Sequence, residues 1–544
     1  MSSILRKDLR SQVAELIVIR ASGHSLDSQR EYPQWEISNK TLKELLELGV
    51  GGVILYGGNI QEISDRCKTI KKWSNKKLLL CADVEEGLGQ RFRGGSWLIP
   101  PMGLGLIHQN DSKSAISFAE KYGQCVGDEA RRCGLNWVLA PVCDVNSNSE
   151  NPVINMRAWG DRPEIVAPLV CAFHKGLSSM GVLSCAKHFP GHGDTHVDSH
   201  LELPIVEHDI SRLEEIELIP FKEVIDQGVN SVMTAHLLLK NIDDGNPATF
   251  SKKILNKILR NKLGFKGLIV TDALIMKAIT KSYGTAEAAV MAFNAGSDLI
   301  LMPENPYKAI NAIVDSLVSG QISMNKLEKA LERRRNELSK TEIKTPVSND
   351  SYIDLDQLQK NKYEHLEKDL IEISMQVRKK RNFKNCQEKI NLIRVDGVFP
   401  SPFLSNLSPS LSIPEKLGYK NIVCHPLGIS PWQDDFDEPL ALDRLGEGAL
   451  FIQLFLRGNP FRGNQDIKEP WVNALKQLQR HNRLAGIAVF GSIYLWKDLL
   501  SVLDPNVLAA YSPGQMPSAQ EKVLQALFND EKNDFKSNHY EFTT

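Results

Sequence analysis

The chain has 544 residues, more than one hydrophobic core usually organises, which indicates two or more domains. Hydrophobic residues make up 42% and charged residues 24% of the sequence, which excludes collagen-like, low-complexity and wholly disordered proteins. With 65 Lys and Arg against 66 Asp and Glu, the formal charge is -1. No net positive field would attract nucleic acid or an anionic membrane, so neither is an expected partner.

The cysteines and the N-terminal segment bear on the compartment. The nine cysteines include no CxxC pair and no other tight metal-ligand spacing, which is typical of reduced thiols in a reducing compartment. The apolar stretch 13–21 is interrupted by Glu15 and Arg20, unlike the apolar region of a signal peptide. No window approaches the roughly 18 apolar residues of a membrane span. These features predict a soluble, cytoplasmic protein.

Eight short apolar runs alternate with amphipathic segments across residues 1–340. Runs rich in Val, Ile and Leu and bounded by Gly, Pro or polar residues are typical of parallel strands covered on both faces. The predicted strands are Leu16–Ile19, Val53–Tyr56, Leu78–Ala82, Trp137–Val142, Leu183–Lys187, Ser231–Ala235, Leu268–Thr271 and Asp298–Met302. Predicted crossover helices include Asn39–Leu48, Ser211–Gln227 and Thr285–Ala295. The pattern favours an α/β fold with a (β/α)8 TIM-type barrel; a doubly wound open sheet is the alternative.

The pattern changes near residue 340. The spacing of Leu327–Leu338 predicts the closing helix of the barrel. From Ser339 to Asp356 the periodicity fails, and Pro, Ser, Asn and Asp gather as in interdomain linkers. A helix is predicted at His365–Lys379.

Further strands and helices follow this helix. Strands are predicted at Ile390–Val395, Ile422–Cys424, Leu450–Phe455 and Ile487–Phe490, and helices at Trp471–Arg480 and Ala519–Phe528. The sequence therefore predicts a barrel domain at 1–340, a linker at 341–364 and a smaller C-terminal α/β domain at 365–544.

Polar residues gather where the predicted barrel strands end, the end at which barrel enzymes place their sites. The segment 83–91 (DVEEGLGQR) follows the third strand, and 144–157 follows the fourth. The fifth strand leads into 187–200 (KHFPGHGDTHVDSH). The sixth ends in Thr234-Ala-His236 and the seventh in Thr271-Asp272.

The segment 187–200 holds four histidines and two aspartates, and three interpretations compete for it. A metal site would need these ligands aligned, and the proline and two glycines make the necessary helix unfavourable. A structural polar network would support a long loop. The third interpretation is acid–base catalysis, because in an extended loop Asp198 and His200 lie on one side, where the carboxylate fixes the histidine tautomer.

Asp272 and the cationic residues also have two interpretations each. An Asp directly after an apolar strand is often a helix N-cap, but an ionised Asp272 could also attack an electrophilic carbon. Lys187, Arg91 and Arg157 could be ion-paired supports of the loops. Together with Asp83 they also provide donors and an acceptor suited to binding sugar hydroxyls.

These motifs resemble a known family. The run from Lys187 to His200 is similar to the signature of family 3 glycoside hydrolases of the bacterial β-N-acetylglucosaminidase type. The segments 83–91, 151–157 (NPVINMR), 232–236 (VMTAH) and 270–274 (VTDAL) resemble the family's supporting motifs. The resemblance covers roughly residues 10–340, and the C-terminal part is more loosely similar to the second domain of longer members.

The resemblance implies a role for each matching residue. Asp272 matches the nucleophile, His200 the general acid/base and Asp198 its partner, while Asp83, Arg91, Arg157, Lys187 and His188 match residues that bind N-acetylglucosamine. It implies a retaining exo-β-N-acetylglucosaminidase that forms a covalent glycosyl-enzyme and needs no metal or cofactor. The implied substrates are peptidoglycan fragments (muropeptides) with a terminal N-acetylglucosamine.

Three alternatives stay open at this point. They are a family-3 β-glucosidase, an N-acetylglucosaminide phosphorylase, and a non-enzymatic sugar-binding protein on the same scaffold. The sequence also departs from the family at Glu86, where glycine is commoner, and an extra carboxylate there could narrow the sugar selectivity. The oligomeric state is not indicated.

Overall fold

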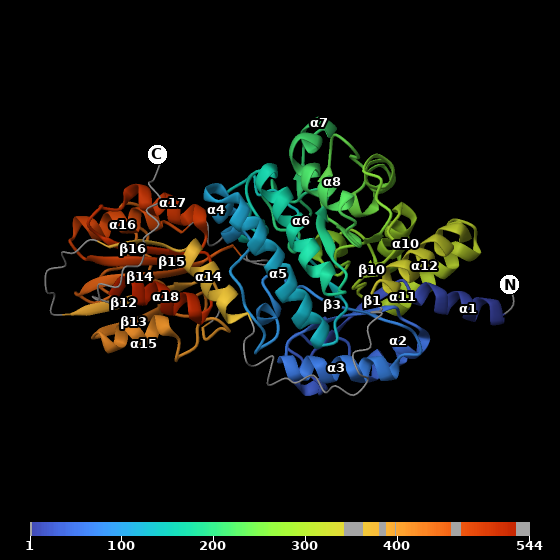
Figure 1. Cartoon of the computed structure of the whole chain (residues 1–544), viewed down its shortest axis with the longest axis horizontal. Helices are drawn as coiled ribbons and strands as arrows, with labels where there is room; N and C mark the ends of the chain where they lie inside the picture. The colour runs from blue at the N-terminus through green and yellow to red at the C-terminus, as the bar shows by residue number, and fades with distance from the viewer. Residues whose placement is uncertain (1–2, 342–362, 380–387, 398, 459–468, 529–544) are drawn as a thin grey trace. The chain divides into compact units, whose positions relative to one another are not determined.

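The computed structural model describes residues 3–341, 363–379, 388–397, 399–458 and 469–528. Its residues fall into two compact units, the first ending at Glu367 and the second beginning at Lys368 (Figure 1). Apart from its ends, the predicted linker 341–364 lies outside the described residues. The predicted boundaries 1–340 and 365–544 stay predictions.

Eight parallel strands form the centre of the first unit. One sheet has the order β10-β1-β2-β3-β4 and a second has the order β5-β7-β9. Parallel bridges Trp137↔Leu183 and Val270↔Leu299 join the two sheets at both edges, so the ring is closed. The predicted (β/α)8 barrel is confirmed and the open-sheet alternative is excluded. The strands are β1 (Ile17–Ser22), β2 (Gly52–Tyr56), β3 (Leu79–Ala82), β4 (Trp137–Val138), β5 (Cys185–Phe189), β7 (Ser231–Thr234), β9 (Leu268–Val270) and β10 (Ile300–Leu301).

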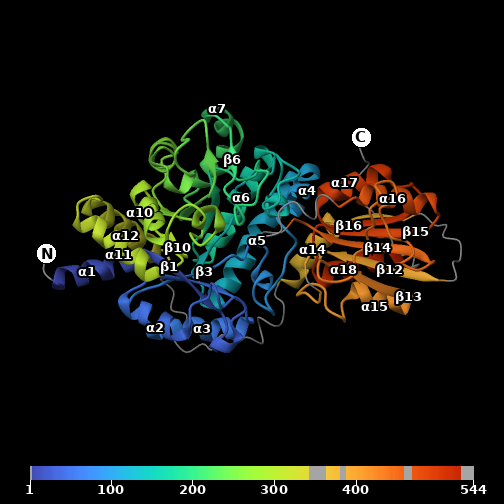
Figure 2. The same cartoon turned by 180° about the vertical axis from the view of Figure 1, so that it is seen from behind.

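The barrel strands form where the sequence has continuous apolar runs. Strands β3, β7 and β9 are buried at every position, as expected for strands with the barrel interior on one face and helices on the other. Figures 1 and 2 show the helices of this unit outside the strands. The longer ones are α1 (Ser3–Ala14), α2 (Asn39–Leu48), α3 (Ile60–Trp73), α4 (Met102–Asn110), α5 (Ser112–Arg132), α6 (Pro163–Ser179), α8 (Leu218–Asp226), α10 (Thr285–Ala295), α11 (Pro306–Val318) and α12 (Met324–Ser339).

Local sequence determines the ends of several of these helices. Helix α2 begins after Ser38, whose side chain accepts a hydrogen bond from the backbone N–H of Thr41, and it ends at Gly49 with a φ of 109°. Helices α2 and α10 have the predicted bounds. The predicted helix Ser211–Gln227 consists of three consecutive helical segments, α7 (Ile210–Arg212), η4 (Leu213–Glu217) and α8.

Short elements complete the first unit. The strands β6 (Ile205–Val206) and β8 (Leu238–Leu239) pair in parallel beyond the barrel. The short helical segments are η1 (Asp27–Gln29), η2 (Leu88–Gln90), η3 (Asn155–Arg157), η5 (Ala248–Phe250), η6 (Lys253–Lys262) and α9 (Lys277–Thr280).

The second unit is a six-stranded sheet with the order β11-β16-β15-β14-β12-β13. The five strands from β12 onward pair in parallel, in the order typical of doubly wound α/β domains. Rings of Phe455 and Phe490 stack in its core with centroids 4.6 Å apart. The strands are β11 (Gln376–Arg378), β12 (Lys389–Val395), β13 (Tyr419–Cys424), β14 (Ala449–Leu456), β15 (Leu484–Gly491) and β16 (Leu508–Ser512), and the helices are α14 (Glu364–Ser374), which begins in the first unit, α15 (Pro409–Lys416), α16 (Trp471–Arg480), α17 (Ile493–Val502) and α18 (Pro517–Phe528).

One predicted element is wrong in its second half. The helix predicted at His365–Lys379 ends at Ser374, and Gln376–Arg378 forms strand β11. This strand pairs antiparallel with β16, and Val377 packs against the core of the second unit. Hydrogen bonding to a partner distant in sequence therefore overrides the helical periodicity of this segment.

No helix in the described part of the chain combines the length and the apolar character that crossing a bilayer requires.

Candidate active site

The predicted site residues lie at or beyond the carboxyl ends of the barrel strands. Because all eight strands are parallel, these ends share one face of the barrel. Asp83 follows β3, Arg91 follows η2, Arg157 ends η3, Lys187 and His188 belong to β5, Asp198 and His200 lie in the loop after β5, and Asp272 comes two residues after β9.

Four charged side chains, two of them buried and two partly buried, form the first cluster on this face. The Lys187 ammonium lies 2.8 Å from Asp83 Oδ1 and 2.6 Å from Glu85 Oε1. The Arg157 guanidinium donates to both oxygens of Glu85, at 2.8 Å each. Two cations thus face two carboxylates, and Glu85 connects the loop after β4 to strand β5.

The pKa values in this cluster follow from its ion pairs. Burial raises the pKa of Glu85, but the charges of Arg157 and Lys187 outweigh burial and hold that pKa well below its usual range. The charges of Lys187 and Arg91 likewise outweigh burial and lower the pKa of Asp83. Burial lowers the pKa of Lys187, yet its two carboxylate neighbours produce a net rise. All of these groups are charged at neutral pH.

An aromatic side chain supports Asp83 from the neighbouring strand. The Tyr56 hydroxyl donates to Asp83 Oδ2 at 2.5 Å. The Arg91 side chain is exposed and donates from Nε to the backbone carbonyl of Asp83 at 3.0 Å. The Arg20 guanidinium lies over the Tyr56 ring, 4.1 Å from the ring centroid. Asp83 is therefore held in one orientation with a fifth of its side chain exposed.

A buried carboxylate, Asp144, organises the start of the loop after β5. His188 donates to it from its backbone N–H and contacts Oδ2 through Nδ1 at 2.7 Å. The backbone N–H of His192 donates to Asp144 Oδ1 at 2.7 Å. The side chain of Asp144 is fully buried, so it fixes the ring of His188 and the path of the following chain.

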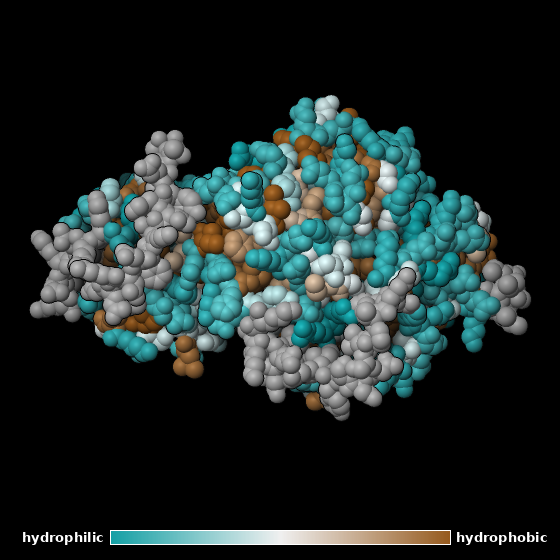
Figure 3. All heavy atoms as spheres, in the orientation of Figure 1, coloured by the Kyte–Doolittle hydropathy of each residue, from teal (hydrophilic) through white to brown (hydrophobic). Residues whose placement is uncertain are grey.

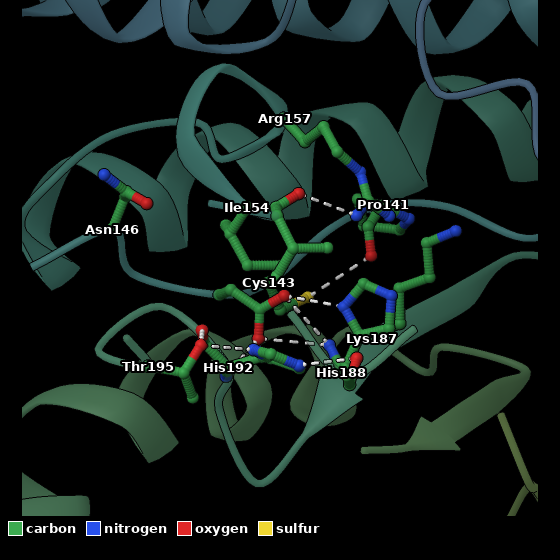
Figure 4. Close-up of polar contacts among 12 residues, drawn as sticks. Pro141, Cys143, Asn146, Ile154, Arg157, Lys187, His188, His192 and Thr195 are labelled. Atoms are coloured by element: carbon green, nitrogen blue, oxygen red, sulfur yellow. Dashed lines mark hydrogen bonds and ion pairs between the residues drawn. The ribbon is translucent and has the colours of Figure 1, made fainter. Parts of the chain in front are cut away.

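His192 continues this network inward and is not exposed to the site face. Its Nδ1 lies 2.8 Å from Thr195 Oγ1, and its Nε2 lies 2.9 Å from Ser199 Oγ (Figure 4). Thr195 Oγ1 already donates to the His192 carbonyl, so it accepts from Nδ1–H, and Nε2 accepts from Ser199. Burial lowers the pKa of His192 to about 4, which keeps the ring neutral. This part of the loop is the structural polar network considered from sequence.

Asp198 and His200 form the close pair that the sequence predicts. Asp198 Oδ1 accepts from the backbone N–H of His200 at 2.9 Å and lies 2.8 Å from its Nδ1. The carboxylate is fully buried, whereas 21% of the histidine side chain is exposed. Nδ1–H therefore donates to Asp198, and Nε2 is the nitrogen that can exchange a proton with a ligand.

Asp272 lies close to three histidines. Its Oδ1 accepts a hydrogen bond from the backbone N–H of Ala273 at 2.7 Å. The other carboxylate oxygen, Oδ2, takes no part in this hydrogen bond. Burial raises the pKa of Asp272, but the charges of His236, His188 and His200 outweigh burial and lower it. Asp272 is thus an ionised carboxylate, and it does not cap a helix, because α9 begins five residues later.

His236 supports this carboxylate indirectly. Its Nε2–H donates to the Ala273 carbonyl at 3.1 Å, and its Nδ1 lies 2.8 Å from Thr249 Oγ1. The ring is fully buried, and burial lowers its pKa. His236 therefore fixes the backbone that carries Asp272.

A cavity of about 280 Å³ lies on this face, and none of the predicted site residues lines it. It is lined by residues of the loop after β1, among them Trp35, and by Ile275 and Met302, which follow β9 and β10. The Tyr32 and Trp35 rings stack with centroids 5.7 Å apart. Within the described ranges, no group of three His, Cys, Asp or Glu side chains could hold a metal ion.

Four residues of this face were not predicted as site residues. Glu85, Asp144, Tyr56 and His236 hold the predicted ones in place through the contacts described above. Glu85 follows Asp83 by two positions, a spacing that puts both on one side of an extended segment. Glu86 is the position at which the sequence departs from the family motif. Its carboxylate accepts a hydrogen bond from the Trp97 indole N–H at 3.1 Å and is therefore directed at the segment that carries Trp97.

Two family models match almost the whole chain. The glycosyl hydrolase family 3 N-terminal domain matches residues 8–336, and the bacterial glycosyl hydrolase family 3 C-terminal domain matches residues 382–529. The chain belongs to glycosyl hydrolase family 3. It is accordingly a glycoside hydrolase by family, as the motifs predict.

Curated relatives of this family-3 chain carry the name β-hexosaminidase. Beta-hexosaminidase A of Pseudoalteromonas piscicida is 32% identical over 342 residues, which span 57% of this chain and 56% of that protein. The beta-hexosaminidase of Tolumonas auensis is 39% identical over 272 residues, 49% of this chain and 79% of that protein.

Solved structures share the fold over both domains. A family 3 β-N-acetylglucosaminidase from Paenibacillus superposes with a TM-score of 0.73 at 24% identity and covers 95% of this chain and 96% of its own. The beta-glucoside phosphorylase BglX superposes with a TM-score of 0.74 at 20% identity and covers 97% of this chain and 95% of its own. At these identities the likeness concerns the fold alone.

Proposed function

We propose that the protein is a retaining exo-β-N-acetylglucosaminidase. The observation that carries the proposal is the Asp198–His200 pair, whose partly exposed histidine ring is oriented by Asp198, on the same face as the ionised Asp272. This combination provides a proton donor and a nucleophile without a second catalytic carboxylate. A sugar-binding protein would need neither group.

The proposed reaction has two steps. In the first, Asp272 Oδ2 attacks the anomeric carbon while the imidazolium of His200 gives its Nε2 proton to the departing glycosidic oxygen. In the second, neutral His200 takes a proton from water, whose oxygen displaces Asp272 and releases the sugar. The Asp198 carboxylate stabilises the imidazolium, and two inversions retain the anomeric configuration.

The four-charge cluster is suited to holding the sugar. Asp83 is oriented by Tyr56 and Lys187, so its oxygens can accept from sugar hydroxyls. Arg157 and Lys187 can donate, and their pairing with Glu85 keeps them positioned before the substrate arrives. We assign N-acetylglucosamine to this subsite because of the named relatives and the motif resemblance.

The motif resemblance extends the proposal to the substrate, and the free cysteines of the described residues extend it to the compartment. We propose that the protein acts in the cytoplasm on peptidoglycan fragments that end in non-reducing N-acetylglucosamine.

The experiment compares p-nitrophenyl N-acetyl-β-glucosaminide with the matching β-glucoside and then identifies the nucleophile. We expect turnover of the former to exceed that of the latter. A mechanism-based fluorosugar should label Asp272 of the native protein, while Asp272→Ala should lower turnover by several orders of magnitude and abolish labelling. Labelling of Asp83 or Glu86 would contradict the assignment.

Three product measurements test the finer statements. Proton NMR should show the β-anomer as the first product, which is retention. The disaccharide of N-acetylglucosamine and anhydro-N-acetylmuramic acid should be cleaved. Free sugar should form with or without phosphate, whereas a sugar 1-phosphate would indicate a phosphorylase.

A further inference from the structure

A second concave site lies at the opposite end of the barrel, where strands begin. A cavity of about 460 Å³ lies between helix η6, the end of α10 and the start of α12. Helix η6 leads into β9, and Asp298 on the cavity wall lies two residues before β10. The candidate active site is at the carboxyl ends of the same strands, so the two sites are separate.

The side chains that line this cavity carry an excess of positive charge. Asp298 binds two of the cations: Arg260 Nη2 donates to Oδ2 at 2.5 Å, and Arg333 Nη1 donates to Oδ1 at 2.8 Å. Lys326 and Lys329 add two further cations to the lining. One carboxylate therefore faces four cationic groups.

Two further features of the wall are suited to an anion. Helix α12 is 16 residues long and starts at the cavity, where Ser323 and Asn325 belong to the lining. The Ser323 side chain makes no capping hydrogen bond to the first turn of α12. The positive end of the helix dipole therefore faces the cavity without a side-chain cap from Ser323. Ser297, another lining residue, is 2% exposed, and its hydroxyl has no hydrogen-bond partner.

The titration behaviour of the cations agrees with this charge excess. Burial lowers the pKa of Arg260 to about 10, although Asp298 opposes the change. Burial and the charge of Lys252 both lower the pKa of Lys326. An anion in the cavity would offset the cost of holding these charges in a partly dehydrated place.

We propose that this cavity binds a small phosphate dianion, either inorganic phosphate or the phosphate group of a sugar phosphate. The cations and the start of α12 would bind the phosphate oxygens. The volume is large enough for a phosphorylated monosaccharide, and the amide of Asn325 on the wall is suited to hydroxyl groups. Figure 3 shows a largely hydrophilic surface over α10 and α12.

The test is isothermal titration calorimetry on the full-length protein with inorganic phosphate, glucose 6-phosphate and uncharged glucose. We expect one phosphate or glucose 6-phosphate per chain, weaker affinity at higher salt, and no binding of glucose at this site. Equal affinity for the two phosphates indicates the inorganic ion, and at least tenfold tighter binding of the ester indicates a sugar phosphate.

Variants connect the binding to the cavity. The double variant Lys326→Gln and Lys329→Gln should weaken binding at least tenfold, since each lysine supplies a charge-assisted contact. Lys308→Gln removes an exposed lysine from the neighbouring helix α11, outside the cavity, and should leave the affinity unchanged. A melting temperature close to that of the native protein shows that the variants are folded.

Two results would overturn the proposal. One is no saturable binding of either phosphate at millimolar concentration. The other is binding that survives in the double variant or disappears when N-acetylglucosamine saturates the candidate active site, because the anion would then sit elsewhere. Phosphate binding and its loss in the double variant are measured without reference to the proposed glycosidase activity.

Discussion

Glu85 gives a sharp test of how the candidate site is held together. Its carboxylate accepts two hydrogen bonds from Arg157 and contacts the ammonium of Lys187. The exposed side-chain fractions are 3% for Glu85, 14% for Arg157 and 2% for Lys187. Glu85→Gln keeps the shape of the side chain but leaves these two cations with one carboxylate, Asp83.

The expected loss of stability follows from this burial. Removing one partner of a buried ion pair costs about 3–5 kcal/mol, because the other charge stays buried without compensation. The glutamine carbonyl still accepts one hydrogen bond, which favours the lower end, about 3 kcal/mol. Glu120→Gln is the matched control, since Glu120 pairs with Lys175 at 3.0 Å on the surface, and it should cost only about 0.2–1 kcal/mol.

Hydrogen exchange measured by mass spectrometry reports this loss where it occurs. In Glu85→Gln, amides of β3 and β5 that exchange through unfolding of the first unit should exchange about a hundredfold faster, which corresponds to about 3 kcal/mol. Substrate binding should also weaken, because Arg157 and Lys187 lose their common partner. Equal protection in Glu85→Gln and Glu120→Gln would refute the reasoning.

The pH dependence supplies a second readout with a fixed sign. The pKa of Glu85 in the fold is held well below its unfolded value of about 4.3. Its contribution to stability is therefore complete above pH about 4.3 and is lost as the pH falls through the folded pKa. This part of the acid destabilisation should be missing in Glu85→Gln and present in Glu120→Gln.

Two further predictions concern histidines of the loop after β5. His200→Ala should slow the first chemical step little for activated aryl leaving groups and far more for sugar leaving groups, because only the latter need protonation; an equal loss across a graded series would make His200 a binding residue. The pKa of His192 in the fold is about 4 and its unfolded value is about 6.5, so stability should fall by up to about 3 kcal/mol as the pH drops between these values. Urea unfolding should show this fall in the free energy of unfolding for the native protein and not for His192→Asn. The same dependence on pH in both proteins would contradict the prediction.

The fold could be predicted where local patterns and tertiary pairing agree. Buried parallel strands such as β2 are continuous apolar runs, and α10 has both an apolar face and a terminal Gly296, so its bounds follow from the sequence. Strand β16 and strand β11 could not be predicted in this way. Leu508–Ser512 is short and contains two alanines, and Gln376–Arg378 is an edge strand, so both depend on pairing with distant segments.

The candidate site could be predicted by residue type but not by partner. Asp198 and His200 are two positions apart, so their contact is local and follows from the sequence. Asp144 and His188 are 44 positions apart, and Glu85 and Arg157 are 72 apart, so only the closed barrel brings them together. The motif resemblance identified Arg157 and His188, but it did not identify Glu85 and Asp144, the carboxylates that hold their side chains.

From the charge distribution on the two faces we propose that water, and not phosphate, accepts the glycosyl group. At the candidate active site, the charges of Lys187 and Arg157 are already compensated by Asp83 and Glu85. A phosphate dianion approaching the glycosyl-enzyme would meet these paired cations and the carboxylates around them, whereas uncharged water meets no repulsion. The lysines of the cavity, Lys326 and Lys329, are at the amino end of the barrel, away from the candidate active site. We therefore expect phosphate to bind the protein without becoming its glycosyl acceptor.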